Sequence, residues 1–362
     1  MKLLFRICAL VIGIAISFAA AEIGLRIFKP QTIGPVLYAH HPQLGAIHVP
    51  NQHGRRFHPG AYDYTYTNNS YGCRGAKEYG KIKGADIRIL FLGDSTTYGV
   101  GVEDDETFVY RIEQILTGAG ISVEAINAGC GGKGTDYSLK FLQVYGETLK
   151  PDLVILCFDG NDFYDNSESV YYGIDENGEL YVKSLQDTFS AKKEFLRKIW
   201  LYDWLTAHSH VAGLLKQTAI KILLKKNKTP GGNKSKKAVI SYPDQKNVYL
   251  NDKQKKETEI LMVNLKREVE TLGSRLFSFY IANKRSIELY RSSKELLLFE
   301  EASTDICRTH NIDYLSLTPF LSDSKEPISK LCFPLDEHFT PTSHLMVAGF
   351  MANKIAKIIK NE

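Results

Sequence analysis

The sequence predicts an α/β fold, a three-layer α/β/α sandwich built on a mostly parallel sheet of five strands. Five short segments are predicted as strands: 89–92, 122–126, 153–158, 275–281 and 312–317. The first is fully apolar, as in a strand buried on both faces, and 153–158 is the most apolar of the five. Segments with one apolar stripe at helical spacing lie between them. Strands that alternate with helices form parallel sheets covered on both faces, which gives the predicted fold class.

The composition indicates a folded α/β chain with a large insertion, or two domains. Of the 362 residues, 44% are hydrophobic and 11% aromatic, which is ample for a core. The net charge of +4 is mild, and no arginine-rich run is interleaved with aromatic residues, so we expect no nucleic-acid partner. The six cysteines show no C-x-x-C and no paired spacing, so they do not indicate the redox compartment.

Residues 1–29 have the pattern of a signal-anchor or a signal peptide. Lys2 and Arg6 precede a mostly apolar stretch over 7–21, and the three alanines at 19–21 suit a signal peptidase. About fifteen residues is short for a spanning helix, which needs roughly twenty, but apolar residues resume beyond Glu22. We therefore favour an uncleaved transmembrane signal-anchor over a cleaved signal, and both over a soluble helix. Either favoured form exports the rest of the chain, because the basic end stays inside.

Two segments depart from the strand–helix alternation. Residues 30–86 are rich in Gly, Pro, His, Tyr and Asn, and we interpret them as a wrapping N-terminal extension, with one edge strand and a turn within 64–75. The main domain covers 87–362 and contains an insertion at about 163–257, whose residues 195–224 have a helical pattern.

The insertion is strongly basic. Between Trp204 and Pro243 there are eight lysines and no acidic residue. A basic, partly amphipathic segment can contact a membrane surface. We favour the alternative, a solvated lid whose apolar face packs on its own domain.

Polar clusters follow the first three strands and precede the last helix. Gly93-Asp94-Ser95 places a hydroxyl at the carboxyl end of the first strand, where open α/β sheets bind ligands. The second strand runs into a glycine-rich segment over 127–135. This segment lacks the Gly at 127 and the Ser or Thr at 134 of a phosphate-binding loop, so we expect no nucleotide. The third strand ends in Asp159-Gly-Asn-Asp162, and the last helix follows Asp336-Glu-His338.

Because the carboxyl ends of parallel strands share one edge, four residues of these clusters can meet there: Ser95, Gly129, Asn161 and His338. They supply a hydroxyl nucleophile, a backbone donor, an amide donor and a base, which is the set that acyl transfer requires. Taken singly, Asn161 has the alternative role of a turn cap, and His338 that of a surface histidine. No histidine or cysteine cluster has metal-ligand spacing, so we expect no metal and no cofactor.

The four motifs, in this order over about 88–360, resemble those of the SGNH (GDSL) hydrolase family. The resemblance implies a flavodoxin-like fold with Ser95 as nucleophile. It implies an oxyanion hole formed by the N–H groups of Ser95 and Gly129 and the amide of Asn161. It also implies His338 as general base, oriented by Asp336.

The last motif departs from the family pattern. The family usually has Asp-x-x-His, whereas here position 335 is leucine and Asp336 lies two residues before His338. On an extended segment Asp336 and His338 share a face and Glu337 does not. Asp94 is expected to tie down its loop, and His344 to lie at the start of the last helix rather than to act as a ligand.

The resemblance and the predicted export together imply a serine esterase. It would remove a small O-acyl group, acetyl by expectation, from a carbohydrate or cell-envelope substrate through an acyl-serine intermediate. An O-acyltransferase that modifies an envelope polysaccharide would use the same intermediate, and a non-catalytic glycan-binding module is the third alternative. The N-terminal segment is similar to those of exported, often anchored, bacterial members. We therefore expect the inner membrane as a partner, a catalytic domain outside the cytoplasm, and an acylated glycan or small molecule as substrate.

Overall fold

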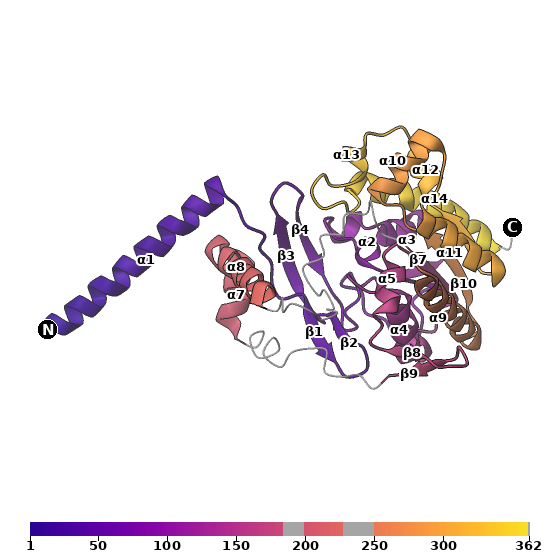
Figure 1. Ribbon diagram of the computed structural model, residues 1–362, viewed down its shortest axis with the longest axis horizontal. Helices are drawn as coiled ribbons and strands as arrows, with labels where there is room; N and C mark the ends of the chain where they lie inside the picture. The colour runs from indigo at the N-terminus through magenta and orange to yellow at the C-terminus, as the bar shows by residue number, and fades with distance from the viewer. Residues whose placement is uncertain (184–198, 227–249, 361–362) are drawn as a thin grey trace.

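A central sheet of five parallel strands forms the core of the computed structural model, which describes residues 1–183, 199–226 and 250–360 (Figure 1). In spatial order the strands are β11 (Asp313–Ser316), β10 (Arg275–Tyr280), β7 (Leu153–Phe158), β5 (Ile87–Gly93) and β6 (Val123–Asn127). Each strand lies where an apolar segment predicts one, and the fold class is confirmed. The pairing is parallel throughout, where the sequence predicts a mostly parallel sheet.

Helices cover both faces because alternate strand residues point to opposite sides. Leu90 and Leu92 of β5 pack in one core and Ile89 and Phe91 in the other. The first face is covered by α4 (Thr135–Leu149), α9 (Asp252–Thr271) and α11 (Leu298–Thr309). The second is covered by α3 (Phe108–Gly118), α10 (Lys284–Ser293), α12 (Thr318–Asp323), α13 (Ile328–Leu331) and α14 (Pro341–Lys360).

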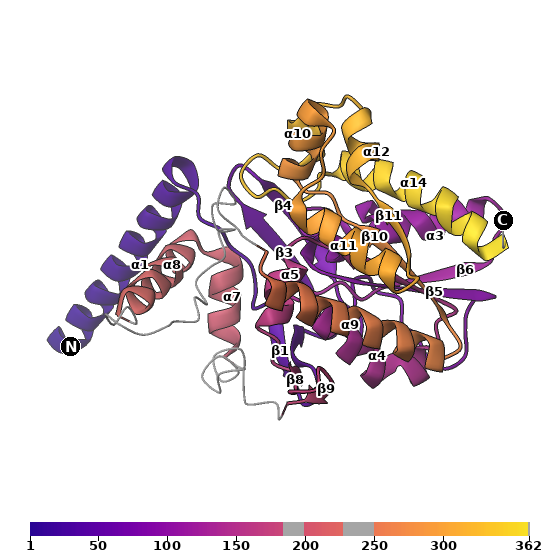
Figure 2. The same ribbon diagram turned by 45° about the vertical axis from the view of Figure 1, so that its right-hand side comes forward.

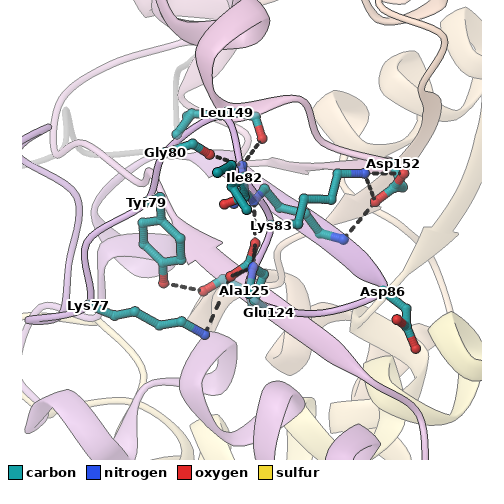
Figure 3. Close-up of polar contacts among 12 residues, drawn as sticks. Lys77, Tyr79, Gly80, Ile82, Lys83, Asp86, Glu124, Ala125, Leu149 and Asp152 are labelled. Carbon is teal, nitrogen blue, oxygen red and sulfur yellow. Dashed lines mark hydrogen bonds and ion pairs between the residues drawn. The ribbon is translucent and has the colours of Figure 1, made fainter.

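A buried ion pair closes the amino end of the sheet. Arg88, which is 0% exposed, donates to Glu124 and to the carbonyl of Gly80. Lys83 approaches Asp152 at 2.5 Å in the same network (Figure 3). Removing one partner of a buried ion pair lowers stability by about 3–5 kcal/mol. We therefore assign a structural role to the residues at the amino end of the sheet. The polar clusters of the sequence lie at the opposite, carboxyl end.

Residues 30–86 contain two β-hairpins, more strand than the single edge strand that the sequence predicts. They are β1 (Tyr38–His41) with β2 (Gly45–His48), and β3 (His53–His58) with β4 (Tyr62–Thr67). Tyr62, Tyr64 and Tyr66 of β4 are buried while the residues between them are exposed. The tyrosines pack on Tyr98 of the main domain, so this hairpin covers the carboxyl edge of the sheet instead of extending it.

α1 (Lys2–Phe28) projects away from the domain, and none of its residues is buried (Figure 1). Among the described residues it is the helix long and apolar enough to cross a membrane. The Glu22 carboxylate accepts hydrogen bonds from the backbone N–H groups of His210 and Val211 and from the Ser209 hydroxyl. These residues begin α8 (His210–Lys226), so the C-terminal part of α1 caps a helix of the insertion.

The described part of the insertion comprises α5 (Asp162–Ser167), β8 (Tyr172–Ile174), β9 (Leu180–Val182), α7 (Trp200–His208) and α8. α7 and α8 lie between α1 and the β3–β4 hairpin in both views (Figure 2). The Gly34 N–H donates to the Thr206 carbonyl and the Val36 N–H to Asp203. These helices therefore pack on N-terminal segments. Residues 195–198 of the predicted helical stretch lie outside the described residues.

Candidate active site

Ser95 begins α2 (Ser95–Tyr98) at the carboxyl end of β5. The turn before it requires Gly93, because a Cβ at that position would lie 2.7 Å from the Cys157 carbonyl and 2.4 Å from Thr97 Oγ1. The close approach of β5 and β7 therefore fixes the chain just before the serine. Ser95 is half-buried, so the residue is partly exposed at this edge.

His338 and Asp336 approach Ser95 from the loop between α13 and α14. His338 Nε2 lies 2.8 Å from Ser95 Oγ, and His338 Nδ1 is hydrogen-bonded to Asp336 Oδ1. The side chains of His338 and Asp336 are 15% and 17% exposed. The structure thus brings the three residues together in the order that nucleophilic catalysis uses.

The loop that carries Asp336 and His338 is a tight turn, and it is not an extended segment. The N–H groups of Asp336 and Glu337 both donate to the Phe333 carbonyl, and the Phe333 N–H donates to the His338 carbonyl at 2.9 Å. Glu337 has a φ of +69°, in the left-handed region. Asp336 and His338 therefore meet across a left-handed residue and not through the alternation of an extended strand.

The electrostatic setting of Asp336 keeps it ionised. Burial raises the pKa of this carboxyl, but the hydrogen bond and charge of His338 outweigh burial and hold the pKa below its usual value. The Tyr62 hydroxyl also lies beside Asp336. An ionised acid beside Nδ1 can fix the tautomer that leaves Nε2 free to accept a proton.

The Gly129 N–H, which the family resemblance implies as an oxyanion-hole donor, makes a hydrogen bond within the chain. This N–H donates to Asn127 Oδ1 at 3.1 Å. A Cβ at Gly129 would lie 2.3 Å from the Tyr98 backbone nitrogen, so this glycine allows β6 to pack closely on α2. The N–H of Gly129 is therefore engaged within the β6–α2 contact.

The next glycines lie closer to the nucleophile. A Cβ at Gly131 would lie 3.5 Å from Ser95 Cβ, and the Gly131 N–H makes no hydrogen bond within the described part of the chain. The Gly132 N–H donates to Asp94, as does that of Lys133 at 3.4 Å. Asp94 thus ties down this loop, as the sequence predicts. In the sequence, the Gly131-Gly132 doublet is the signal that could have indicated a second segment lying close to Ser95.

Asn161 follows β7 and lies beside two carboxylates. Its amide Nδ2 donates to Asp94 at 2.6 Å and to Asp165 at 2.9 Å, while Oδ1 is buried without a partner in the described structure. Both amide hydrogens are therefore engaged. The sequence placed Asn161 at this edge but did not identify Asp165 as its neighbour.

Acidic side chains accumulate around Asn161. Burial, followed by the negative charge of Asp94, raises the pKa of Asp159 and of Asp165 to about 7. Burial likewise raises the pKa of Asp162 and of Asp94. Because so many carboxyls share a poorly solvated site, protons are retained there near neutral pH.

His344 lies in the first turns of α14, as the sequence predicts, and is fully buried. Its Nδ1 accepts a hydrogen bond from the Phe108 N–H at 3.1 Å, and the two rings stack with centroids 5.5 Å apart. Burial lowers the pKa of His344 to about 3, so it is neutral. It joins α3 to α14.

Comparison with known proteins adds a family to this geometry. The model of the GDSL-like lipase/acylhydrolase family matches residues 91–230, which contain Ser95, Gly129 and Asn161. Residues 91–230 therefore resemble a GDSL-like lipase/acylhydrolase domain. This match and the arrangement of Ser95, His338 and Asp336 support a serine ester hydrolase. The family match ends before Asp336 and His338, so their placement beside Ser95 comes from the structure.

Solved structures similar to this chain include three hydrolases. The psychrotrophic esterase EstA from Pseudoalteromonas sp. is 14% identical with a TM-score of 0.42, and the match covers 76% of this chain and 100% of that one. The acetylxylan esterase Axe2 from Geobacillus stearothermophilus is 13% identical (TM-score 0.40; 75% and 95% covered). A lipase/acylhydrolase from Enterococcus faecalis is 14% identical (TM-score 0.37; 74% and 95% covered). No curated protein matched the chain.

Proposed function

We propose that this protein hydrolyses a small O-acyl ester, with acetyl as the expected acyl group, on a carbohydrate or cell-envelope substrate. The observation that carries the proposal is the continuous hydrogen-bonded series from Ser95 through His338 to Asp336. The carbohydrate class follows from the family resemblance and the predicted export rather than from a residue of the site.

In the proposed reaction Ser95 Oγ attacks the acyl carbonyl while His338 Nε2 accepts its proton. The bond to the sugar oxygen breaks, and His338 returns the proton to that oxygen, which leaves as the alcohol. Water then attacks the acyl-serine, again losing a proton to His338, and the free acid and the Ser95 hydroxyl are regenerated. Asp336 orients the imidazole and offsets the positive charge that it acquires.

The developing oxyanion needs donors beside Ser95. We infer that the N–H groups of Ser95 and Gly131 and the amide of Asn161 supply them, with Gly131 in place of Gly129. Asn161 must release one of its two carboxylate partners to do so. A proton on Asp165 would weaken that contact, and the raised pKa of Asp165 keeps this proton available near neutral pH.

Two measurements test the proposal. A fluorophosphonate probe, which traps an activated serine hydroxyl, should label the wild-type protein and leave Ser95→Ala unlabelled. Incubation with an acetylated sugar should release acetate. If acetyl appears instead on an added acceptor glycan, the protein is an O-acyltransferase. Equal labelling of both proteins removes Ser95 from the mechanism, and no labelling of either favours a glycan-binding module.

We also propose that α1 anchors the protein in the bacterial inner membrane, with the catalytic domain outside the cytoplasm. The supporting features are the apolar length of α1, its exposure, and the basic residues Lys2 and Arg6 at its start. In this arrangement residues 30–86 form the extension that covers the domain of 87–362.

A further inference from the structure

The β3–β4 hairpin presents an arginine on the face that covers the active-site helix. In the strand register Arg56 is opposite Tyr64, and His58 is opposite Tyr62. Residues directly opposite each other share a face of the hairpin, so Arg56 and His58 lie on the face of the buried tyrosines. That face packs on Tyr98 of α2, the helix that begins at Ser95.

Arg56 differs from the neighbouring arginines in lacking a carboxylate partner among the described residues. Arg55, on the outer face, pairs with Asp63 at 2.5 Å. Arg74 pairs with Asp104 and donates to the backbone carbonyls of Gly99, Thr65 and Val102. The Arg56 guanidinium is close enough to the Tyr64 hydroxyl for a side-chain interaction, although the pair lacks good hydrogen-bond geometry, and it lies 5.9 Å from the centroid of the Tyr62 ring.

The charge of Arg56 acts on two tyrosines, of which one lies beside Asp336 and the other bonds Gly131. The hydroxyl of Tyr62 lies beside Asp336, and the charge of Arg56 acts on both groups. On the other side, the charge of Arg56 acts on the hydroxyl of Tyr38, which donates to the Gly131 carbonyl at 3.0 Å. Gly131 is the residue at which a Cβ would lie 3.5 Å from Ser95 Cβ.

Buried polar atoms around this face lack partners in the described structure. They are both ring nitrogens of His48, Nδ1 of His58 and the hydroxyl of Tyr64. The His48 ring stacks on Tyr98 with centroids 4.0 Å apart and on Tyr38 at 4.9 Å. Buried polar groups are normally hydrogen-bonded, so a cluster of unpaired ones beside a cation without a carboxylate at ion-pair distance points to a polar ligand.

We propose that this face binds an anionic group of the ester substrate, a carboxylate or a phosphate, with Arg56 as its charged partner. The proposal rests on the proposed esterase function and adds a substrate class to it: acyl esters of acidic molecules. The arginine guanidinium matches carboxylate and phosphate oxygens through two parallel hydrogen bonds. An anion would give Arg56 a partner at ion-pair distance, whereas a neutral sugar would leave it with only the more distant charge of Asp336.

A structural role for Arg56 as a cation over tyrosine rings is the alternative. Such stacking uses the ring face but none of the five guanidinium N–H donors. It also gives no account of the unpaired ring nitrogens of His48 and Nδ1 of His58. The two roles differ in what they predict for substrate preference.

The test compares matched acetyl esters: methyl O-acetylgalactosiduronate, the corresponding neutral galactoside, and the galactoside 6-phosphate. We expect the wild-type kcat/KM to be at least about tenfold higher for one anionic ester than for the neutral one, and the better substrate distinguishes carboxylate from phosphate. Arg56→Gln should lower that preference by about 10–100-fold, the scale of a hydrogen bond to a charged group. The ratio between substrates removes any effect of Arg56 on Asp336, because the triad treats all three esters alike.

Arg55→Gln is the matched control, since it removes an adjacent charge from the outer face, and it should leave the preference unchanged. An unchanged preference in Arg56→Gln, or equal wild-type rates on neutral and anionic esters, overturns the proposal. If Arg56→Gln fails to fold, the wild-type ratio of kcat/KM between the anionic and the neutral ester tests the proposal. The esterase function is tested separately with 4-nitrophenyl acetate: no Ser95-dependent hydrolysis of it would refute that function, whatever the charge preference.

Discussion

His338 Nε2 lies 2.8 Å from Ser95 Oγ, although 243 positions separate the two residues in the sequence. Ser95 is placed by the end of β5, and His338 by a turn that packs between α13 and α14. The contact is therefore a property of the whole α/β domain. Its catalytic value depends on the third residue, Asp336, which determines the orientation of the imidazole.

Asp336→Asn should lower kcat by about 10³–10⁴, the scale known for loss of a triad acid. The amide can donate a hydrogen to Nδ1 and so favours the tautomer in which Nε2 carries the proton. The measurement is kcat on 4-nitrophenyl acetate with the fold checked by circular dichroism. Glu337→Gln is the adjacent control and should stay within about tenfold, under roughly 1.4 kcal/mol of barrier. If Glu337→Gln causes the large loss of kcat instead, Asp336 is not the acid of the triad.

Asn161→Ala should lower kcat by about 10²–10³ with a much smaller change in KM, because an oxyanion donor acts mainly in the transition state. The same substitution also removes the contacts to Asp94 and Asp165. Steady-state kinetics on an acetyl ester checks it. An unchanged kcat would leave Asn161 as a turn residue only.

The central strands and the polar edge were predictable because burial on both faces favours apolar segments, as in β5 and β7. The turn that holds Asp336 was not predictable from the sequence. Its left-handed residue is Glu337, whereas glycine or asparagine usually occupies such a position. The capture of the Gly129 N–H by Asn127 depends on a side-chain rotamer, which the motif does not encode.

The N-terminal hairpins were only partly predictable. The alternation in Tyr62-Asp-Tyr-Thr-Tyr66 is a strand signal, but its partner strand contains His53, Arg55, Arg56 and His58 and shows no clear apolar period. The contact between the tyrosine face of this hairpin and Tyr98 depends on the tertiary fold, because Tyr62 and Tyr98 belong to segments far apart in the chain. The sequence pattern of the hairpin alone does not predict it.

Asp165 makes stability depend on pH in a defined direction. In the unfolded chain its carboxyl ionises near pH 4, but burial and the charge of Asp94 raise the pKa in the folded protein to about 7. Between these values the folded state binds more protons, so its stability falls as pH rises. Asp165→Asn should remove this loss, and its advantage over wild type in urea unfolding should grow by about a few kcal/mol from pH 4 to pH 8. A constant difference across that range would contradict the prediction.

His344→Ala should lower the free energy of unfolding by about 2–4 kcal/mol. It leaves the buried Phe108 N–H without its acceptor and removes a ring stacked on Phe108. Activity per folded molecule should stay within about tenfold, since His344 does not contact Ser95 or Asp336. His310→Ala is the control: this half-buried histidine bonds Glu259 at 2.7 Å on the surface, and its loss should cost less than about 1 kcal/mol. A large loss of activity at normal stability would place His344 in the reaction.

The proposed anchor makes separable predictions about membrane attachment and about α8. If α1 spans the membrane, the full chain should stay in the membrane fraction after carbonate washing, and protease added to spheroplasts should digest residues beyond 30. Release as a soluble protein that begins near Glu22 would show a cleaved signal peptide.

Glu22→Ala separates anchoring from capping. Glu22 accepts the Ser209 hydroxyl and the N–H groups of His210 and Val211, so its loss should weaken the start of α8 by about 1 kcal/mol, the usual worth of a helix cap. Limited proteolysis within 209–226 should accelerate several-fold, while retention in the membrane stays unchanged because the apolar length of α1 is intact. Ser17→Ala, in an exposed position of the same helix whose hydroxyl bonds only the Gly13 carbonyl, should change neither readout. Loss of membrane retention in Glu22→Ala would mean that α1 is held by the domain and not by lipid.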